Sequence, residues 1–171
     1  MATDRVTVRA FRADEWREYR ALRLRALAEA PDAFMTTLAD AAARPDDAWQ
    51  ARLAGAEHGK ELPLVAERGG QPAGLCWGAL DADDPTLAHL YQMWVAPEHR
   101  GAGVGRALLA RAIEWARARG ARRMVLDVTC GDTPARRLYD AAGFIPAAPP
   151  EAIRPGSDVM VQPMRLDLGG E

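Results

Sequence analysis

The clearest chemical signal in this chain of 171 residues is a glycine-rich turn that follows an apolar run. The turn reads Val95-Ala-Pro-Glu-His-Arg-Gly-Ala-Gly-Val-Gly-Arg106, and an amphipathic segment comes directly after it. Glycines allow a ligand to approach the backbone closely, and the unpaired amides at a helix start attract an anion, so phosphate is the natural guest. A Walker loop would need Lys and then Ser or Thr after Gly105, and a dinucleotide loop would need glycine at position 106. Arg106 and Ala107 stand there instead, which disfavours both.

A second motif, Ala135-Arg-Arg-Leu-Tyr-Asp-Ala-Ala-Gly-Phe144, lies about one helix and one strand farther along the chain. Together with Arg100-x-x-Gly103-x-Gly105, it resembles the paired motifs of the GNAT N-acetyltransferase superfamily. The resemblance extends loosely from about residue 5 to residue 168. It implies a single N-acetyltransferase domain over residues 1–171 with a mixed α/β fold, in which a central, mostly antiparallel sheet splays in the middle and is flanked by helices.

The resemblance also implies where acetyl-CoA binds, between the expected strands 87–95 and 123–129. It implies that the pantetheine arm of CoA pairs with the backbone of Met93, Trp94 and Val95. It also implies that the pyrophosphate binds to the backbone amides of Gly101, Ala102, Gly103, Val104, Gly105 and Arg106. The side chains of Arg100 and Arg106 would add positive charge there. Asp132 stands where the family often has Asn. Because a carboxylate would repel phosphates, a contact between Asp132 and CoA is left open.

Tyr139 resembles the family tyrosine that faces the CoA sulfur. Attack on a thioester expels a thiolate, and a phenol with a pKa of about 10 can protonate that thiolate while staying neutral at pH 7. The resemblance therefore implies a general acid at Tyr139. The alternative is a core tyrosine that packs beside Leu138 and Phe144.

A general base must take a proton from the attacking amine, and His89 is the first candidate. It falls where some relatives carry a catalytic glutamate, and an imidazole with a pKa near 6.5 suits the task. Strict alternation would put His89, Tyr91, Met93 and Val95 on one side of the strand, whereas a bulge, usual in the family, would change that. The rival bases are Tyr91 and Asp127, and a histidine that merely bonds within the sheet is the plain alternative.

Several elements must form to bring these residues together. Apolar periodicity and turn residues predict strands over residues 6–9, 62–67, 72–80, 87–95, 123–129 and 159–168, the last interrupted by Pro163. They predict helices over residues 14–30, 46–53, 103–119 and 134–142. We expect Asp14 to cap the first helix and Asp132 to be available as a cap for the last. The alternation of strands and helices indicates a mixed α/β sheet.

The composition limits the partners. A net charge of -2 gives no basic field, so nucleic acid is not an expected partner. No window holds the roughly 18 apolar residues of a membrane span, so no membrane association is expected, and the cytoplasm is the expected location. Two cysteines and three histidines without ligand spacing predict no disulfide framework, no metal and no covalent thiol route.

The acceptor is the least determined part. A small-molecule amine is expected, and among acceptors an aminoglycoside-like antibiotic, an amino acid and a protein amino terminus or side chain are left open. A non-catalytic acetyl-CoA sensor, another nucleotide-binding domain and a homodimer are also left open. The irregular stretch 30–45, with Phe34 and Met35, and the proline-rich stretch 147–157 are the candidate rims of the acceptor site.

Overall fold

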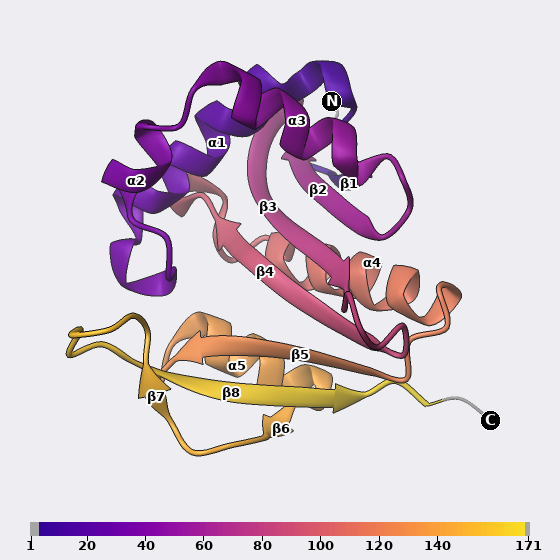
Figure 1. The fold of residues 1–171 in the computed structure, drawn as a ribbon, viewed down its shortest axis with the longest axis vertical. Coiled ribbons are helices and arrows are strands. Elements are labelled where there is room, and N and C mark those ends of the chain that lie inside the picture. The colour runs from indigo at the N-terminus through magenta and orange to yellow at the C-terminus, as the bar shows by residue number, and fades with distance from the viewer. Residues whose placement is uncertain (1–3, 170–171) are drawn as a thin grey trace.

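The computed structural model describes residues 4–169, in which strands and helices alternate around one sheet (Figure 1). The strands are β1 Val6–Ala10, β2 Glu61–Arg68, β3 Gln71–Leu80, β4 Leu87–Val95, β5 Arg123–Thr129, β6 Ile145–Pro146, β7 Glu151–Ala152 and β8 Met160–Asp167. The helices are α1 Trp16–Glu29, α2 Leu38–Ala42, α3 Asp46–Ala56, α4 Val104–Ala118 and α5 Pro134–Ala142. Within the described range no helix is long and apolar enough to cross a bilayer.

The sheet has the order β1-β2-β3-β4-β5-β8-β6, with β7 also paired to β8. All pairs along it are antiparallel except β4 with β5, which is parallel. The parallel pairing covers Leu87 with Arg123 through His89 with Val125 and then stops. Beyond His89 the two strands separate toward their carboxyl ends, as Figure 1 shows. The predicted fold class, a mostly antiparallel sheet that splays in the middle, is confirmed.

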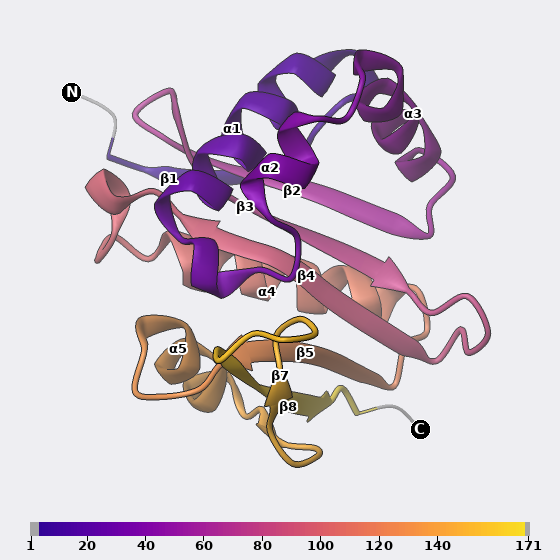
Figure 2. The same cartoon turned by 60° about the vertical axis from the view of Figure 1, so that its left-hand side comes forward.

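Helices cover both faces of the sheet (Figure 2). On one face α4 packs against β1 to β4, and its apolar stripe, including Val104, Leu108 and Ala112, is buried in a core with Met124 of β5. On the other face α1 and α3 bury an aromatic core around Tyr19, Trp49 and Trp77. The two cores give the central strands apolar side chains on both sides, which explains the unbroken apolar runs of β2 and β3.

A bulge in β4 changes which way its side chains point. Tyr91 pairs with Trp77, and Trp94 pairs with Leu75, so β4 has one more residue than β3 in this stretch. Gln92 takes the extra position with a left-handed backbone (φ 62°). Before the bulge Tyr91 lies on the α1 face with Trp77, and after it Trp94 takes that face.

Strict alternation would place His89, Tyr91, Met93 and Val95 on one side of β4, and this is wrong for Met93 and Val95. His89 and Tyr91 do share a side, and their rings stack with centroids 5.6 Å apart. Met93 and Val95 pack instead against the core under α4, on the opposite side of the sheet. The bulge is the physical reason, because one extra residue inverts the alternation beyond it.

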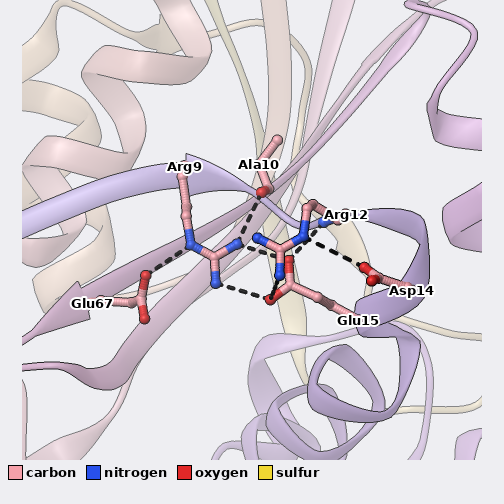
Figure 3. A network of polar contacts seen from close by, with 6 residues as sticks. All are labelled: Arg9, Ala10, Arg12, Asp14, Glu15 and Glu67. Atoms are coloured by element: carbon pink, nitrogen blue, oxygen red, sulfur yellow. Dashed lines mark hydrogen bonds and ion pairs between the residues drawn. The ribbon is translucent and has the colours of Figure 1, made fainter.

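The expected cap at Asp14 is wrong. The chain enters α1 through a short 3-10 turn at Ala13–Glu15, and the carboxylate that accepts an amide there is Glu15, from Arg12 at 2.8 Å. Arg9 bridges Glu15 and Glu67, with nitrogen–oxygen distances of 2.8 Å to each (Figure 3). Glu15 is buried, so its neutralisation by Arg9 fixes the start of the helix onto β1 and β2.

Two further expectations need correction. Thr133, not Asp132, caps α5, since its hydroxyl accepts from the amide of Arg136 at 3.1 Å, whereas Asp132 pairs with Arg137 on the surface. Pro163 does not interrupt the last strand: β8 continues through it, and its carbonyl still accepts from the amide of Ala147 at 2.9 Å. The stretch between α1 and α3 also contains the short helix α2, which its weak pattern did not predict.

Candidate active site

A cleft of about 1360 Å³ lies where β4 and β5 separate. One wall is β4 from His89 to Val95, and the facing wall is β5 from Val125 to Thr129. The start of α4, the helix α5 and the segment 30–36 complete the lining. The backbone of β4 beyond His89 is paired with β3 on one edge and unpaired with β5 on the other. An extended ligand arm can therefore add to that edge as a strand would.

The glycine-rich turn stands at the mouth of this cleft. Gly101 and Gly103 have φ values of 81° and 85°, a conformation that side chains with a Cβ rarely adopt, and Gly103 is the residue directly before α4. Gly105 lies inside the helix, where an added Cβ would be 3.3 Å from Leu138 and 3.5 Å from Val95. The absence of side chains here leaves room for a ligand beside the first turn of α4, so the turn fits a phosphate.

The structure brings most of the predicted binding residues to the cleft. Those that line it are Met93, Trp94, Val95, Arg100, Gly101, Val104, Gly105 and Arg106. Ala102 and Gly103 do not line it, although they belong to the same turn. Asp132 is also outside the lining, which instead includes Thr133 and Pro134.

Arg100 is held in place by the end of α1. Its Nε donates to the carbonyl of Val95 at 3.1 Å, and its Nη2 lies 2.8 Å from Glu29. The indole of Trp94 donates to the same Glu29 oxygen at 2.8 Å, and these bonds lower the pKa of Glu29, the Trp94 bond most. Part of the positive charge of Arg100 is therefore already neutralised, whereas Arg106 is exposed at the mouth.

Tyr139 reaches the cleft from α5 and is only 4% exposed. It packs edge-on against Phe144, with ring centroids 5.6 Å apart. Burial raises the pKa of its hydroxyl above the usual value, and the nearby thiol of Cys76 adds to the rise. The phenol is therefore protonated at neutral pH, the state that a general acid requires.

His89 lies at the closed end of the cleft, at the last paired position of β4 and β5. Its Nε2 is 2.8 Å from Oδ1 of Asp81, in the loop that precedes β4. The hydrogen bond from His89 lowers the pKa of Asp81, and backbone amides of Asp83 and Asp84 lower it further. A carboxylate at this place favours the tautomer with the proton on Nε2, which leaves Nδ1 as the acceptor.

The two rival bases lie in the same region. Tyr91 stacks on His89, and burial raises the pKa of its phenol, which makes the ionised form scarcer at neutral pH. Asp127 lines the facing wall, and its pKa is raised mainly by desolvation and then by Glu151. Tyr91 is thus less suited to accept a proton than its usual pKa would indicate, whereas Asp127 becomes a better acceptor than an ordinary aspartate.

Two segments distant in sequence meet over the cleft. Arg154, in the loop after β7, donates to the carbonyls of Pro31, Phe34 and Met35, at 3.4, 2.9 and 3.2 Å. The hydroxyl of Thr129 adds a bond of 2.7 Å to the carbonyl of Asp32. The candidate rims in stretches 30–45 and 147–157 thus touch each other, and residues 30–36, Ala147 and Ile153 line the cleft.

Sequence reasoning missed two arginines of the lining. Arg23, one helical turn after Tyr19, is only 5% exposed, although it interrupts the apolar stripe of α1. Arg52 of α3 also lines the cleft and lies over the ring of Trp77, 4.7 Å from its centroid. The sequence signal that could have revealed Arg23 is its position on the otherwise apolar face of the helix Trp16–Glu29.

Other reactive groups do not gather in the described part of the chain. Among residues 4–169 no cluster of His, Cys, Asp and Glu could hold a metal ion. Cys76 is buried, with the pKa of its thiol raised by desolvation, and Cys130 is free on the surface. The Cys76 thiol is therefore not a poised nucleophile, since reactive thiols have lowered pKa values and access to solvent.

Comparisons with known proteins identify both the sequence family and the fold. The family model "Acetyltransferase (GNAT) family" matches residues 10–144. A GNAT-family acetyltransferase from Streptococcus pneumoniae has a TM-score of 0.82 at 23% identity, covering 96% of this chain and 100% of that one. A structure of a Salmonella typhimurium putative acetyltransferase with acetyl-CoA has a TM-score of 0.79 at 22% identity, covering 98% and 96%. The class is therefore that of acetyl-CoA-dependent N-acetyltransferases.

The chain belongs to the GNAT acetyltransferase family, and acetyl-CoA is its co-substrate. Among curated proteins, a mycothiol acetyltransferase from Thermobispora bispora is 33% identical over 128 residues, which are 72% of this chain and 41% of that protein. The chain spans about two-fifths of the length of that relative. The predicted family, enzyme class and co-substrate are confirmed.

Proposed function

We propose that this chain, acting as a single domain, transfers the acetyl group of acetyl-CoA to the primary amine of a small molecule by direct attack in a ternary complex. One observation carries the proposal: β4 and β5 part beyond His89, directly beside the glycine-rich turn at the start of α4. The free edge of β4, the anion site and a buried tyrosine thus share one cleft. The name of the curated relatives, mycothiol acetyltransferase, supports a small acceptor rather than a protein.

The donor side follows from the cleft. The unpaired edge of β4 at Met93–Val95 offers amides and carbonyls to the pantetheine arm. The amides from Gly101 to Arg106 offer hydrogen bonds to the pyrophosphate, and the exposed Arg106 adds a positive charge. Arg100 acts chiefly by fixing the turn to Val95 and Glu29. The glycines contribute by leaving space, since a Cβ at Gly105 would touch Leu138 and Val95.

Acetyl-CoA supplies a thioester, whose carbon–sulfur bond is replaced by a carbon–nitrogen bond to the neutral amine. The electron pair of the broken bond leaves on sulfur, and Tyr139 gives its phenolic proton to that sulfur. The phenol is protonated before the step, as a general acid must be. The products are the N-acetylated amine and the free thiol of CoA.

The proton of the amine goes to His89, directly or through water. Asp81 holds Nε2 at 2.8 Å, so Nδ1 is the atom that accepts the proton. The carboxylate of Asp81 then stabilises the imidazolium that forms. Asp127 faces His89 across the cleft, and its negative charge adds to that stabilisation.

A panel of primary amines tests the activity through release of the CoA thiol from acetyl-CoA. We expect release with at least one class of small amine and loss of most turnover in Tyr139→Phe. Tight acetyl-CoA binding without release for any amine would instead favour a sensor module.

Donor binding is tested separately by calorimetry with acetyl-CoA. Gly105→Val should weaken binding, since the new side chain enters the cleft from a helical position that tolerates its backbone. Gly55→Val, at a helical glycine of α3 with open space around it, is the matched control. Equal affinities in these two folded variants would remove the donor site from the glycine-rich turn. Gly103 is a poorer test, because its φ of 85° would strain any other residue.

A further inference from the structure

Arg23 is a buried cation that has no counter-ion within the described part of the chain. It lies on α1 one turn after Tyr19 and is 5% exposed. Its Nη1 is fully buried with no hydrogen-bond partner, and the ion pairs among residues 4–169 leave Arg23 out. Glu15, the other buried charge in the described range, is neutralised by Arg9. Of these two buried charges among the described residues, Glu15 has an ion-pair partner and Arg23 has none.

The surroundings of Arg23 make its charge costly. Its guanidinium lies over the ring of Phe34, 4.6 Å from the centroid. Desolvation is the main cause that lowers the pKa of Arg23 to about 10; the positive charges of Arg52 and Arg44 contribute to the decrease, and Tyr19 opposes it. Arg23 is still charged at neutral pH. An unpaired buried cation destabilises a fold, so its presence in a ligand cleft indicates that a ligand supplies the missing anion.

The position of Arg23 separates it from the phosphate site. Arg23 and Phe34 belong to the α1 face of the sheet, whereas α4, with the glycine-rich turn at its start, packs on the other face. Tyr19, on the same face of α1 as Arg23, bonds to Gln92 in the β4 bulge. An anion that pairs with Arg23 would therefore bind near the β4 bulge, on the acceptor side of the cleft and not at the pyrophosphate site.

The opposite part of the same region is acidic. Asp127 faces His89 across the cleft, Glu151 raises the pKa of Asp127, and Asp81 is bonded to His89. An ammonium group would be attracted to these carboxylates before it loses its proton. The acceptor side thus offers a positive group at Arg23 and negative groups around His89, on two walls of one cleft.

We infer, on the basis of the proposed function, that the acceptor is an amine that also carries a carboxylate, such as an amino acid, whose carboxylate pairs with Arg23 while its amine faces His89. A guanidinium fork matches a carboxylate in two parallel hydrogen bonds. Arg52, which also lines the cleft, adds a second positive charge. The apolar lining from Phe34, Ile153 and Val161 favours an apolar side chain on the acceptor.

The test compares three forms of each acceptor in the CoA-release assay: L-leucine, L-methionine and L-phenylalanine, their amides, and their decarboxylated amines. We expect the parent protein to prefer the acids in kcat/KM. Arg23→Met should abolish this preference by raising KM for the acids by roughly 30-fold or more, the range for loss of one partner of a buried charge pair. Arg23→Lys, which keeps the charge and loses the fork, should retain part of it.

Arg17→Met is the matched control, since Arg17 is on the same helix and also lies over an aromatic ring, that of Trp16, but is exposed. Its preference for the acids should equal that of the parent. Thermal melting separates a structural role: removal of an unpaired buried charge should leave the melting temperature of Arg23→Met equal or higher. A parent that acetylates amides as well as acids, or an Arg23→Met variant that keeps the preference, would overturn the inference and leave the proposed function standing.

A binding measurement covers failure of the proposed function itself. If no amine releases CoA, calorimetry with N-acetyl-L-leucine, N-acetyl-L-methionine and N-acetyl-L-phenylalanine and with their amides decides about Arg23 alone. Binding of an acid to the parent and its loss in Arg23→Met would support the carboxylate site. Absence of binding, or equal binding of acid and amide, would overturn it.

Discussion

The hydroxyl of Tyr19 donates a hydrogen bond of 2.7 Å to Oε1 of Gln92, the residue whose φ of 62° forms the bulge of β4. A helix on one face of the sheet thereby holds the irregular residue of the strand that lines the cleft. Because Gln92 is not glycine, its left-handed conformation costs roughly 1–2 kcal/mol, and the partly buried hydrogen bond from Tyr19 helps to offset that cost.

Removal of the Tyr19 hydroxyl tests whether its hydrogen bond to Gln92 stabilises the bulge of β4. Tyr19→Phe should lower the free energy of unfolding by about 0.5–1.5 kcal/mol, the usual net value of one hydrogen bond. It should also weaken acetyl-CoA binding, because the backbone beyond the bulge faces the cleft. Urea unfolding and calorimetry measure the two effects. Tyr91→Phe, at a half-exposed tyrosine of the same strand, is the control for stability, and equal losses in both variants would contradict the role of the bond.

Tyr139→Phe removes one oxygen and keeps the ring against Phe144. Turnover should fall by ~10²–10⁴-fold, the typical contribution of a general acid, with little change in acetyl-CoA affinity. Steady-state kinetics and calorimetry provide the two values. Turnover within about threefold of the parent, well below that range, would assign Tyr139 to the core.

His89 is tested by the pH dependence of kcat/KM, with an acceptor whose amine pKa is known. A base must be neutral to act, so the rate should rise with pH and then level off. His89→Gln should lose this rising limb. Identical profiles in the parent and His89→Gln would transfer the limb to the amine or to Asp127.

Glu15 makes the fold sensitive to acid. Hydrogen bonds from Arg9 lower the pKa of Glu15 to about 2, below the value of about 4.3 for an unfolded glutamate. The stability that comes from this shift is present above pH ~4.3 and is lost as pH falls toward 2. Glu15→Gln should therefore cost about 1–3 kcal/mol at pH 7 and flatten the loss of stability over that acid window.

Urea midpoints at a series of pH values measure this effect. Asp14→Asn is the control, since Asp14 is largely exposed and its ion pair with Arg12 has a distance of 3.5 Å. A similar acid dependence in Glu15→Gln and in the parent would show that other carboxylates govern the transition.

Periodicity predicted the elements around the cleft well, because strong apolar patterns and glycines mark their ends. The bounds of β4, β5 and α5 agree with the prediction. The direction of side chains within β4 was wrong beyond Gln92, since a bulge depends on the pairing with β3 and on Tyr19, which are distant in sequence. Local propensity could not show that Glu15, rather than Asp14, accepts the helix-start amide, because Arg9 and Glu67 select it.

Site residues that belong to a sequence motif could be predicted, whereas residues that only folding brings to the cleft could not. Tyr139 and the turn from Gly101 to Arg106 stand in motifs, and the structure brings most of them to one cleft. Arg23 has no motif: its importance appears only when its burial and lack of a counter-ion are known. Asp81 likewise gains its place by folding, when the loop before β4 returns beside His89.

Arg154 fastens the rim segment by three backbone carbonyls, those of Pro31, Phe34 and Met35, and by none of its side chains. These three bonds therefore do not depend on the exposed side chains of the segment, such as Met35. Exposed positions in residues 31–36 can be randomised in a library while Arg154 keeps the loop docked, whereas Phe34 is buried under Arg23 and must stay. The protein thus separates the anchoring of its rim from the selection of its acceptor, and a new acceptor specificity can arise by substitution in one short loop.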